Sequence, residues 1–144
     1  MTDGPARLIV TGGRSIPLEH AHALYWTLER FHAEHPHMIL AHGQCPHPRL
    51  EWDEARKCWL RRRFWSADSV ADDWAETRVA VVRFPANWNA HGRAAGPLRN
   101  EHMVQTFRPT HYIVAPGGRG TADCVERLEK FKAVRFDLLN KPVT

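Results

Sequence analysis

The chain has 144 residues, 43% of them hydrophobic, and a formal net charge of +4. This length suits one globular domain, so we expect a single domain over residues 1–144. No run approaches the ~18 consecutive apolar residues of a membrane span, and no apolar stretch follows a basic amino-terminal segment, so we expect a cytoplasmic protein without membrane contact. The three cysteines form no CxxC pair, which favours free thiols. The positive charge favours anionic partners.

Apolar runs alternate with stretches of helical spacing along the chain. The apolar runs predict buried strands near residues 8–10, 37–43, 78–84 and 111–115, and 141–144 (KPVT) would begin a fifth. Apolar residues at steps of three and four predict helices over about 15–35, 66–77, 96–106 and from 121 onward, the first with Ser15 as its cap. We expect residues 85–96 to form a loop. The alternation predicts a Rossmann-like three-layer α/β domain, with a mainly parallel sheet of four or five strands flanked by helices.

Residues 46–65, PHPRLEWDEARKCWLRRRFW, interrupt this alternation and are interpreted as an insertion. Trp52, Ala55 and Trp59 would share a helical face, while Leu50 and Trp52 alternate as in a strand, so a β-hairpin and a short helix fit equally. Arg61–Arg63 lie beside aromatic residues, as in surfaces that bind single-stranded nucleic acid. A subunit contact and a solvated face are the alternatives.

Three predicted strands end at glycines: Gly12-Gly13, Gly43 and Gly117-Gly118. Because the carboxyl ends of parallel strands share one edge of a sheet, we expect a ligand site there. In PGGRGT, residues 116–121, missing side chains expose backbone N–H groups to an anion at a helix N-terminus, which predicts a phosphate site. The alternative is a tight turn whose glycines need positive φ. The loop is neither a Walker motif nor GxGxxG.

The stretch NWNAHGRAAGPLRNEH, residues 87–102, gathers Trp88, His91, Arg93, Arg99 and Asn100. Aromatic, imidazole and guanidinium groups together suit a nucleobase and its phosphate, with Arg14 as a further bidentate phosphate ligand. The alternative is a solvated basic loop in which Trp88 fills the core.

Other patterns speak against metal and cysteine chemistry. His32-Ala33-Glu34 lacks the PCxxC of zinc deaminases, and no HExxH occurs, so we expect no metal site. Cys124 near a helix start could be a nucleophile, but we expect a packing residue. Asp72 and Asp73 could act as a carboxylate pair, but helical neighbours point about 100° apart, so we expect one of them on a solvated face.

The segments LIVTGGR, AHG, ADSVADDWA, FPANWNAHGRAAGPLRNEHM and IVAPGGRGTADCV resemble, in order and spacing, the YspA-type, cpYpsA-related branch of the SLOG superfamily. That superfamily also holds the LOG phosphoribohydrolases and the DNA-processing protein DprA. The resemblance spans the chain except residues 46–65, and it implies a Rossmann-like fold whose glycine-rich loops bind nucleotides or their derivatives. With Trp88 and Arg119 from the motifs themselves, the expected ligand residues are Gly12, Gly13, Arg14, Gly43, Asp68, Trp88, His91, Gly92, Arg93, Gly96, Arg99, Asn100, Gly117, Gly118, Arg119, Gly120 and Thr121.

The LOG enzymes carry PGGxGTxxE, whose glutamate serves N-glycosidic cleavage together with an upstream arginine. Arg99 is similar to that arginine, but Cys124 holds the glutamate position, and Asp123 lies one residue earlier. The leading hypothesis is therefore a nucleotide-binding sensor or regulator that requires no cofactor. The alternatives are an N-glycosidase acting on nucleoside 5′-monophosphates, with Arg99 and Asp123 as catalytic residues, and a DprA-like DNA-binding protein using Arg61–Arg63. LOG relatives commonly dimerise, so we expect a homodimer or higher homo-oligomer.

Overall fold

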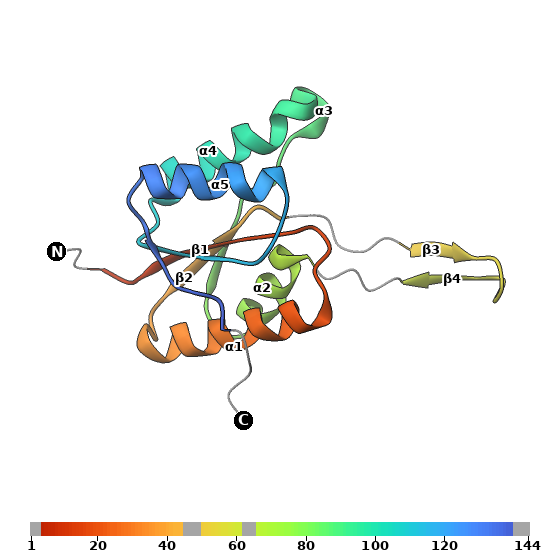
Figure 1. The fold of residues 1–144 in the computed structure, drawn as a ribbon, viewed down its shortest axis with the longest axis horizontal. Coiled ribbons are helices and arrows are strands. Elements are labelled where there is room, and N and C mark those ends of the chain that lie inside the picture. Colours follow the sequence, from red (N-terminus) through yellow and green to blue (C-terminus); the bar gives the residue numbers. More distant parts are fainter. Residues whose placement is uncertain (1–3, 45–49, 62–65, 140–144) are drawn as a thin grey trace.

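The computed structural model describes residues 4–44, 50–61 and 66–139 (Figure 1). Five strands form one sheet, in the order β5-β2-β1-β6-β7, with every pairing parallel. The strands of the sheet are β1 (Arg7–Thr11), β2 (Ile39–His42), β5 (Ala80–Arg83), β6 (His111–Val114) and β7 (Val134–Arg135). The helices are α1 (Leu18–Glu34), α2 (Ala67–Glu76), α3 (Trp88–His91), α4 (Ala95–Phe107) and α5 (Arg119–Lys130), with a 3-10 turn η1 (Gly92–Ala94). The predicted mainly parallel α/β sheet flanked by helices is confirmed.

The sheet lies between two helical layers (Figure 1). Successive strand residues point to opposite faces, so Leu8 and Val10 pack with α1 and α2, whereas Ile9 packs with α4 and α5. All three side chains are fully buried. Burial on both faces explains why β1 is a continuous apolar run without alternation.

The order of the strands creates a crevice beside β1. The chain moves from β1 through β2 to the edge strand β5, and α4 then carries it back to β6 on the other side of β1. The loops that follow β1 and β6 therefore diverge to opposite faces of the sheet. In open α/β sheets this switch point is where ligands bind, outside the carboxyl ends of the strands.

The starts of the helices differ in how their free N–H groups are satisfied. Ser66 and Ser69 form a complete capping box on α2, with N–H to Oγ distances of 2.9 and 3.0 Å. In contrast, none of the described side chains caps α1, α4 or α5. The predicted Ser15 cap is wrong, because α1 begins only at Leu18, with Pro17 in the capping position.

Three segments differ from the sequence predictions. β5 is half-exposed instead of buried, because it is an edge strand: Val81 packs toward α1 and α2, while Val82 is 38% exposed. Residues 88–96 of the expected loop are helical, and the helical stretch begins where the Asn87 side chain accepts the Ala90 N–H and caps α3. A fifth strand is present as β7; the predicted strand at residues 141–144 lies outside the described residues.

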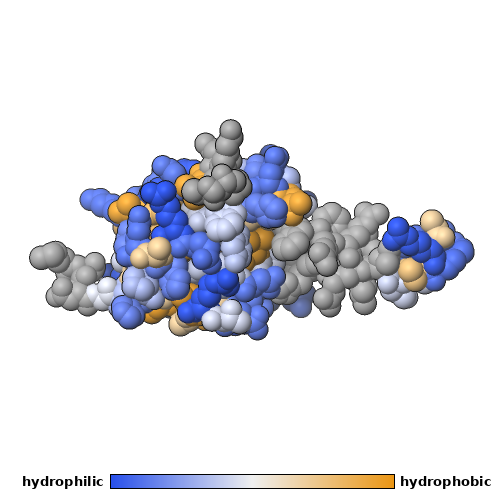
Figure 2. Space-filling model, turned by 90° about the horizontal axis from the view of Figure 1, so that it is seen from below, coloured by the Kyte–Doolittle hydropathy of each residue, from blue (hydrophilic) through white to orange (hydrophobic). Residues whose placement is uncertain are grey.

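The insertion contains a β-hairpin, so the short-helix alternative is wrong. Its strands β3 (Leu50–Asp53) and β4 (Cys58–Arg61) pair antiparallel, with Trp52 opposite Trp59. The hairpin projects away from the sheet (Figures 1 and 2). The two indole rings contact each other edge to face, with their centroids 5.6 Å apart. None of the helices formed by the described residues combines the length and apolarity needed to cross a membrane.

Candidate functional site

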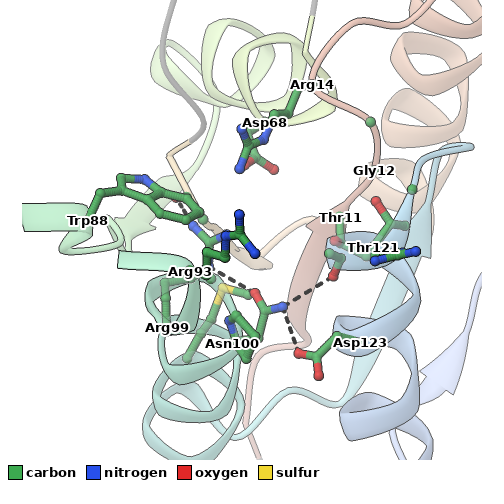
Figure 3. Close-up of a pocket in the computed structure, with 18 residues that line it drawn as sticks. Thr11, Gly12, Arg14, Asp68, Trp88, Arg93, Arg99, Asn100, Thr121 and Asp123 are labelled. Carbon is green, nitrogen blue, oxygen red and sulfur yellow. Dashed lines mark hydrogen bonds between the residues drawn. The ribbon is translucent and has the colours of Figure 1, made fainter. Parts of the chain in front are cut away.

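A cavity of about 600 Å³ lies at the switch point, between the loops that follow β1 and β6 (Figure 3). This volume is within the range of small-molecule sites. Trp88 and Arg93 lie on one side of the cavity, with Thr121 and Asp123 across from them (Figure 3). The cavity is lined by Thr11, Gly12, Gly13, Arg14, Gly43, Asp68, Trp88, Arg93, Gly96, Pro97, Arg99, Asn100, Met103, Gly118, Arg119, Gly120, Thr121 and Asp123.

Most of the residues expected from the sequence meet in this cavity, but three do not line it. His91 and Gly92 are exposed at the junction of α3 and η1, and Gly117 lies close to Gly13 and Thr121 without lining the cavity. The sequence reasoning missed Thr11, Pro97 and Met103. Their positions carried a signal, because Thr11 directly precedes the Gly12-Gly13 turn, and Pro97 and Met103 lie on the helix that carries Arg99.

The wall formed by the start of α5 is open to the cavity. Gly118 is the N-cap of α5, and no described side chain caps this helix. Backbone N–H groups of its first turn therefore lack an intrahelical partner and form the positive end of the helix dipole. A Cβ added at Gly118 or Gly120 would meet nothing within 4 Å. This space is available to a ligand.

The alternative that this loop needs positive φ is wrong. Among the described glycines only Gly92 has a positive φ, of 53°, and Gly118 has a φ of −96°. Gly117 is instead required for close packing, since a Cβ there would overlap Thr121 Oγ1 and lie 2.7 Å from the Gly13 nitrogen.

The Gly12-Gly13 turn brings three loops together beneath the cavity. Gly13 donates its N–H to the Pro116 carbonyl and accepts the Ala67 N–H, both at 3.0 Å. A Cβ on Gly12 would lie 2.6 Å from the Cβ of Ala67 and 2.8 Å from that of Ala115. Missing side chains therefore let the ends of β1 and β6 approach the start of α2.

Arg99 is held by backbone carbonyls at the ends of two strands. Its Nη1 donates to the Gly43 carbonyl and, at 3.4 Å, to the Phe84 carbonyl, while its Nε donates to Asn100 Oδ1 at 2.8 Å. A Cβ on Gly43 would collide with the guanidinium, so the glycine makes room for it. Arg99 thus ties α4 to the sheet as well as lining the cavity.

The carboxylate of Asp123 is fixed on the opposite wall by two donors. Arg127 Nε lies 2.9 Å and Asn100 Nδ2 lies 3.0 Å from Asp123 Oδ2. Burial opposes ionisation of Asp123, but the hydrogen bonds from Arg127 and Asn100 outweigh it and hold the pKa below its ordinary value of 3.8. Asp123 is therefore an anion at neutral pH, with its charge compensated mainly by Arg127.

Besides Arg99, which is held by carbonyls, three guanidinium groups reach the cavity without a carboxylate partner in the described part of the chain: those of Arg14, Arg93 and Arg119. Arg14 instead lies over the ring of Trp88, with Cζ 5.1 Å from the ring centroid. Such a cation–π contact places positive charge over one face of the indole ring. Asp68, in the first turn of α2, adds a nearly buried carboxylate.

The remaining chemical candidates lie outside the cavity. Cys124 is fully buried; burial raises the pKa of its thiol to about 11 despite a hydrogen bond with Thr11, so the predicted packing role is confirmed. Asp72 binds His42 Nε2 and Arg83 Nε, each at 2.7 Å, and does not pair with Asp73. Burial opposes ionisation of Asp72, but Arg83 and His42 outweigh it and lower its pKa.

Two further predictions from the sequence concern a metal site, which was not expected, and a nucleic-acid site at Arg61–Arg63, which was an alternative. Residues 4–44, 50–61 and 66–139 contain no group of three or more His, Cys, Asp or Glu side chains that could hold a metal ion. Arg61 ends β4, while Arg62 and Arg63 lie outside the described residues. The nucleic-acid hypothesis for Arg61–Arg63 stays a prediction.

No family model matches the chain, and no curated protein matches it at a significant level. The interpretation of the cavity therefore depends on its own chemistry. That chemistry combines an open helix N-terminus, cavity guanidinium groups without a carboxylate partner among the described residues, and an exposed tryptophan.

Proposed function

We propose that the chain binds a nucleotide or a nucleotide derivative in this cavity and acts as a ligand sensor or regulator. The observation that carries the proposal is the uncapped start of α5, with Gly118 and Gly120 open to a cavity that Arg14, Arg93 and Arg119 also line. Helix N-termini with free N–H groups bind phosphate, and guanidinium groups bind it bidentately. The resemblance to nucleotide-binding relatives in the SLOG superfamily supports the same proposal.

In the proposed complex, the phosphate lies against the N–H groups at the start of α5 and beside Arg119. The base packs against Trp88, which is 43% exposed and already held by Arg14. Asp68 accepts hydrogen bonds from ribose hydroxyls, because a carboxylate is an acceptor only. This arrangement uses each polar wall of the cavity for one part of a nucleotide.

Gly120→Ala tests this proposal by closing the open wall. The new methyl group meets no protein atom within 4 Å, and alanine favours a helix over glycine by about 1 kcal/mol, so the variant should unfold at an equal or higher urea concentration. The methyl group would occupy ligand space, so affinity should fall by about tenfold or more, an estimate from the loss of one charged hydrogen bond. Gly4→Ala, at another open position outside the cavity, is the matched control.

The measurement is calorimetric titration with AMP, ADP, ADP-ribose and NAD, together with thermal unfolding. Saturating ligand at 100 times Kd stabilises the folded state by about 2.7 kcal/mol. If none of these nucleotides raises the melting temperature, nucleotide binding is wrong. Unchanged affinity in Gly120→Ala would remove the start of α5 from the site.

A second candidate is hydrolysis of the N-glycosidic bond of a nucleoside 5′-monophosphate, because the ionised Asp123 lines the same cavity. A carboxylate can stabilise the oxocarbenium-like transition state of such a reaction. With AMP, water adds as the bond to adenine breaks, giving adenine and ribose 5-phosphate. Chromatography of that mixture tests the reaction, and Asp123→Asn should abolish it; cleavage that continues unchanged in Asp123→Asn excludes Asp123 as the catalytic residue.

We also propose a cytoplasmic location and a homodimer or higher homo-oligomer. Cys58 and Cys124 are both free thiols, which suits a reducing compartment. Trp52 and Trp59 are 47% and 64% exposed on the projecting hairpin, which supports burial against a second copy. Light scattering of the protein and of Trp59→Ala measures the assembly; a monomeric mass for both excludes it.

A further inference from the structure

We infer that the ligand carries at least two separate anionic groups, as a nucleoside diphosphate or a dinucleotide does, in contrast to the single phosphate of AMP. The inference rests on the proposed nucleotide function and identifies the class of nucleotide. Its basis is the distribution of the cavity arginines over the walls, described next.

Some arginines of the described chain are paired with a carboxylate, and others are not. Arg78, Arg83 and Arg127 each hold a carboxylate, with N to O distances of 3.1, 2.7 and 2.9 Å. Arg93 and Arg119 line the cavity, and the described residues place no carboxylate within ion-pair distance of either. Their charge is therefore available to a ligand.

These two arginines start from different helices. Arg93 lies in η1, which leads directly into α4, and Arg119 is the first residue of α5. The two helices are neighbours on one face of the sheet, and packed helix axes are about 8–10 Å apart. Arg93 also lies on the side of the cavity opposite Thr121 (Figure 3). Positive charge thus comes from two walls, not from one point.

The carboxylate of Asp123 does not remove this charge. Asp123 is compensated by Arg127, whose Nε and Nη2 both bind it, at 2.9 and 3.3 Å. Arg14 is engaged with the face of Trp88, on the side proposed for the base. One phosphate against α5 and Arg119 would leave Arg93 without a partner, whereas a second anionic group can pair with Arg93 bidentately.

The test compares ligands that differ by one phosphate. Calorimetry should give ADP an affinity about tenfold or more above that of AMP, the effect expected of one added charge-assisted interaction. Arg93→Gln should remove most of this advantage and leave the affinity for AMP within about threefold, while Arg119→Gln weakens both ligands. Arg30→Gln, an exposed arginine on α1 outside the cavity, makes the same charge change and should alter neither.

Pyrophosphate and orthophosphate repeat the comparison without a base, so an unsuitable base does not obscure the result. Pyrophosphate should displace bound ADP at a lower concentration than orthophosphate in the wild type, but not in Arg93→Gln. Equal affinity for AMP and ADP in the wild type would overturn the inference and leave nucleotide binding in place. Absence of binding by AMP, ADP and ADP-ribose would overturn the proposed function, and the inference with it.

Discussion

Asn100 on α4 donates a hydrogen bond from Nδ2 to Oδ2 of Asp123 on α5, at 3.0 Å. The same amide nitrogen donates to the Gly120 carbonyl at 3.2 Å, and the amide oxygen accepts from Arg99 Nε at 2.8 Å. Asn100 is only 3% exposed. One buried amide therefore joins the start of α5 to the arginine that is anchored on the ends of β2 and β5.

Replacement of Asn100 by leucine should destabilise the protein by about 2–3 kcal/mol, because buried polar partners lose their hydrogen bonds. Urea unfolding at neutral pH measures this change. Gln105→Leu, on the exposed side of the same helix, is the control and should stay within about 0.5 kcal/mol of the wild type. Equal free energies of unfolding for Asn100→Leu and Gln105→Leu would show that the Asn100 amide does not hold α4 and α5 together.

Asp123→Asn should be less stable than the wild type at pH 7, and the difference should shrink in acid. The pKa of Asp123 is held below 3.8 in the folded protein because the hydrogen bonds from Arg127 and Asn100 outweigh the effect of burial. Between the folded pKa of Asp123 and 3.8, the folded state binds fewer protons than the unfolded state. The stabilisation by the ionised Asp123 is therefore complete above pH 3.8 and is lost as the pH falls through the folded pKa. Urea unfolding of both proteins between pH 7 and pH 3 measures it. A constant difference across that range would contradict the assignment.

The central part of the fold could be predicted from the sequence because its strands are buried on both faces. The apolar runs of β1, β2 and β6 and their terminal glycines located the strands and the edge where the cavity lies. β7 has only two residues, and Val134 is 59% exposed, so it carries no hydrophobic pattern. Trp52 and Trp59 are seven residues apart, which suits two turns of a helix as well as a cross-strand pair.

The residues that line the cavity were easier to predict than the bonds that hold them. The motifs identified Arg99 and Asn100, but the sequence contains no sign that Arg99 donates to carbonyls 56 and 15 residues away. The cause is that tertiary packing decides these partners. His91 belongs to the same motif, yet it lies exposed at the end of α3 and does not line the cavity.

His111 should make the protein less stable in mild acid. Burial, together with the nearby His35, lowers its pKa below 6.5, and the two rings lie 5.1 Å apart. The unfolded state binds the proton more readily, so the free energy of unfolding should decrease as the pH falls through 6.5 toward the folded pKa. Denaturant unfolding from pH 8 to pH 5 should show a smaller slope for His111→Gln than for the wild type. The exposed His22→Gln is the control, and it should keep the wild-type slope; a wild-type slope in His111→Gln would contradict the prediction.

Trp88→Ala should weaken nucleotide binding with little effect on stability. Trp88 is 43% exposed, so truncation should change the free energy of unfolding by less than about 0.5 kcal/mol. Stacking of a base on an aromatic ring contributes about 1–3 kcal/mol, which predicts a loss of about tenfold in affinity for ADP. Pyrophosphate, which has no base, should bind the variant as it binds the wild type.

Trp26 on α1 is 42% exposed and lies outside the cavity, so Trp26→Ala is the matched control. Unaltered affinity for ADP in Trp88→Ala would exclude this face as the position of the base, since no other aromatic side chain among the described residues lines the cavity.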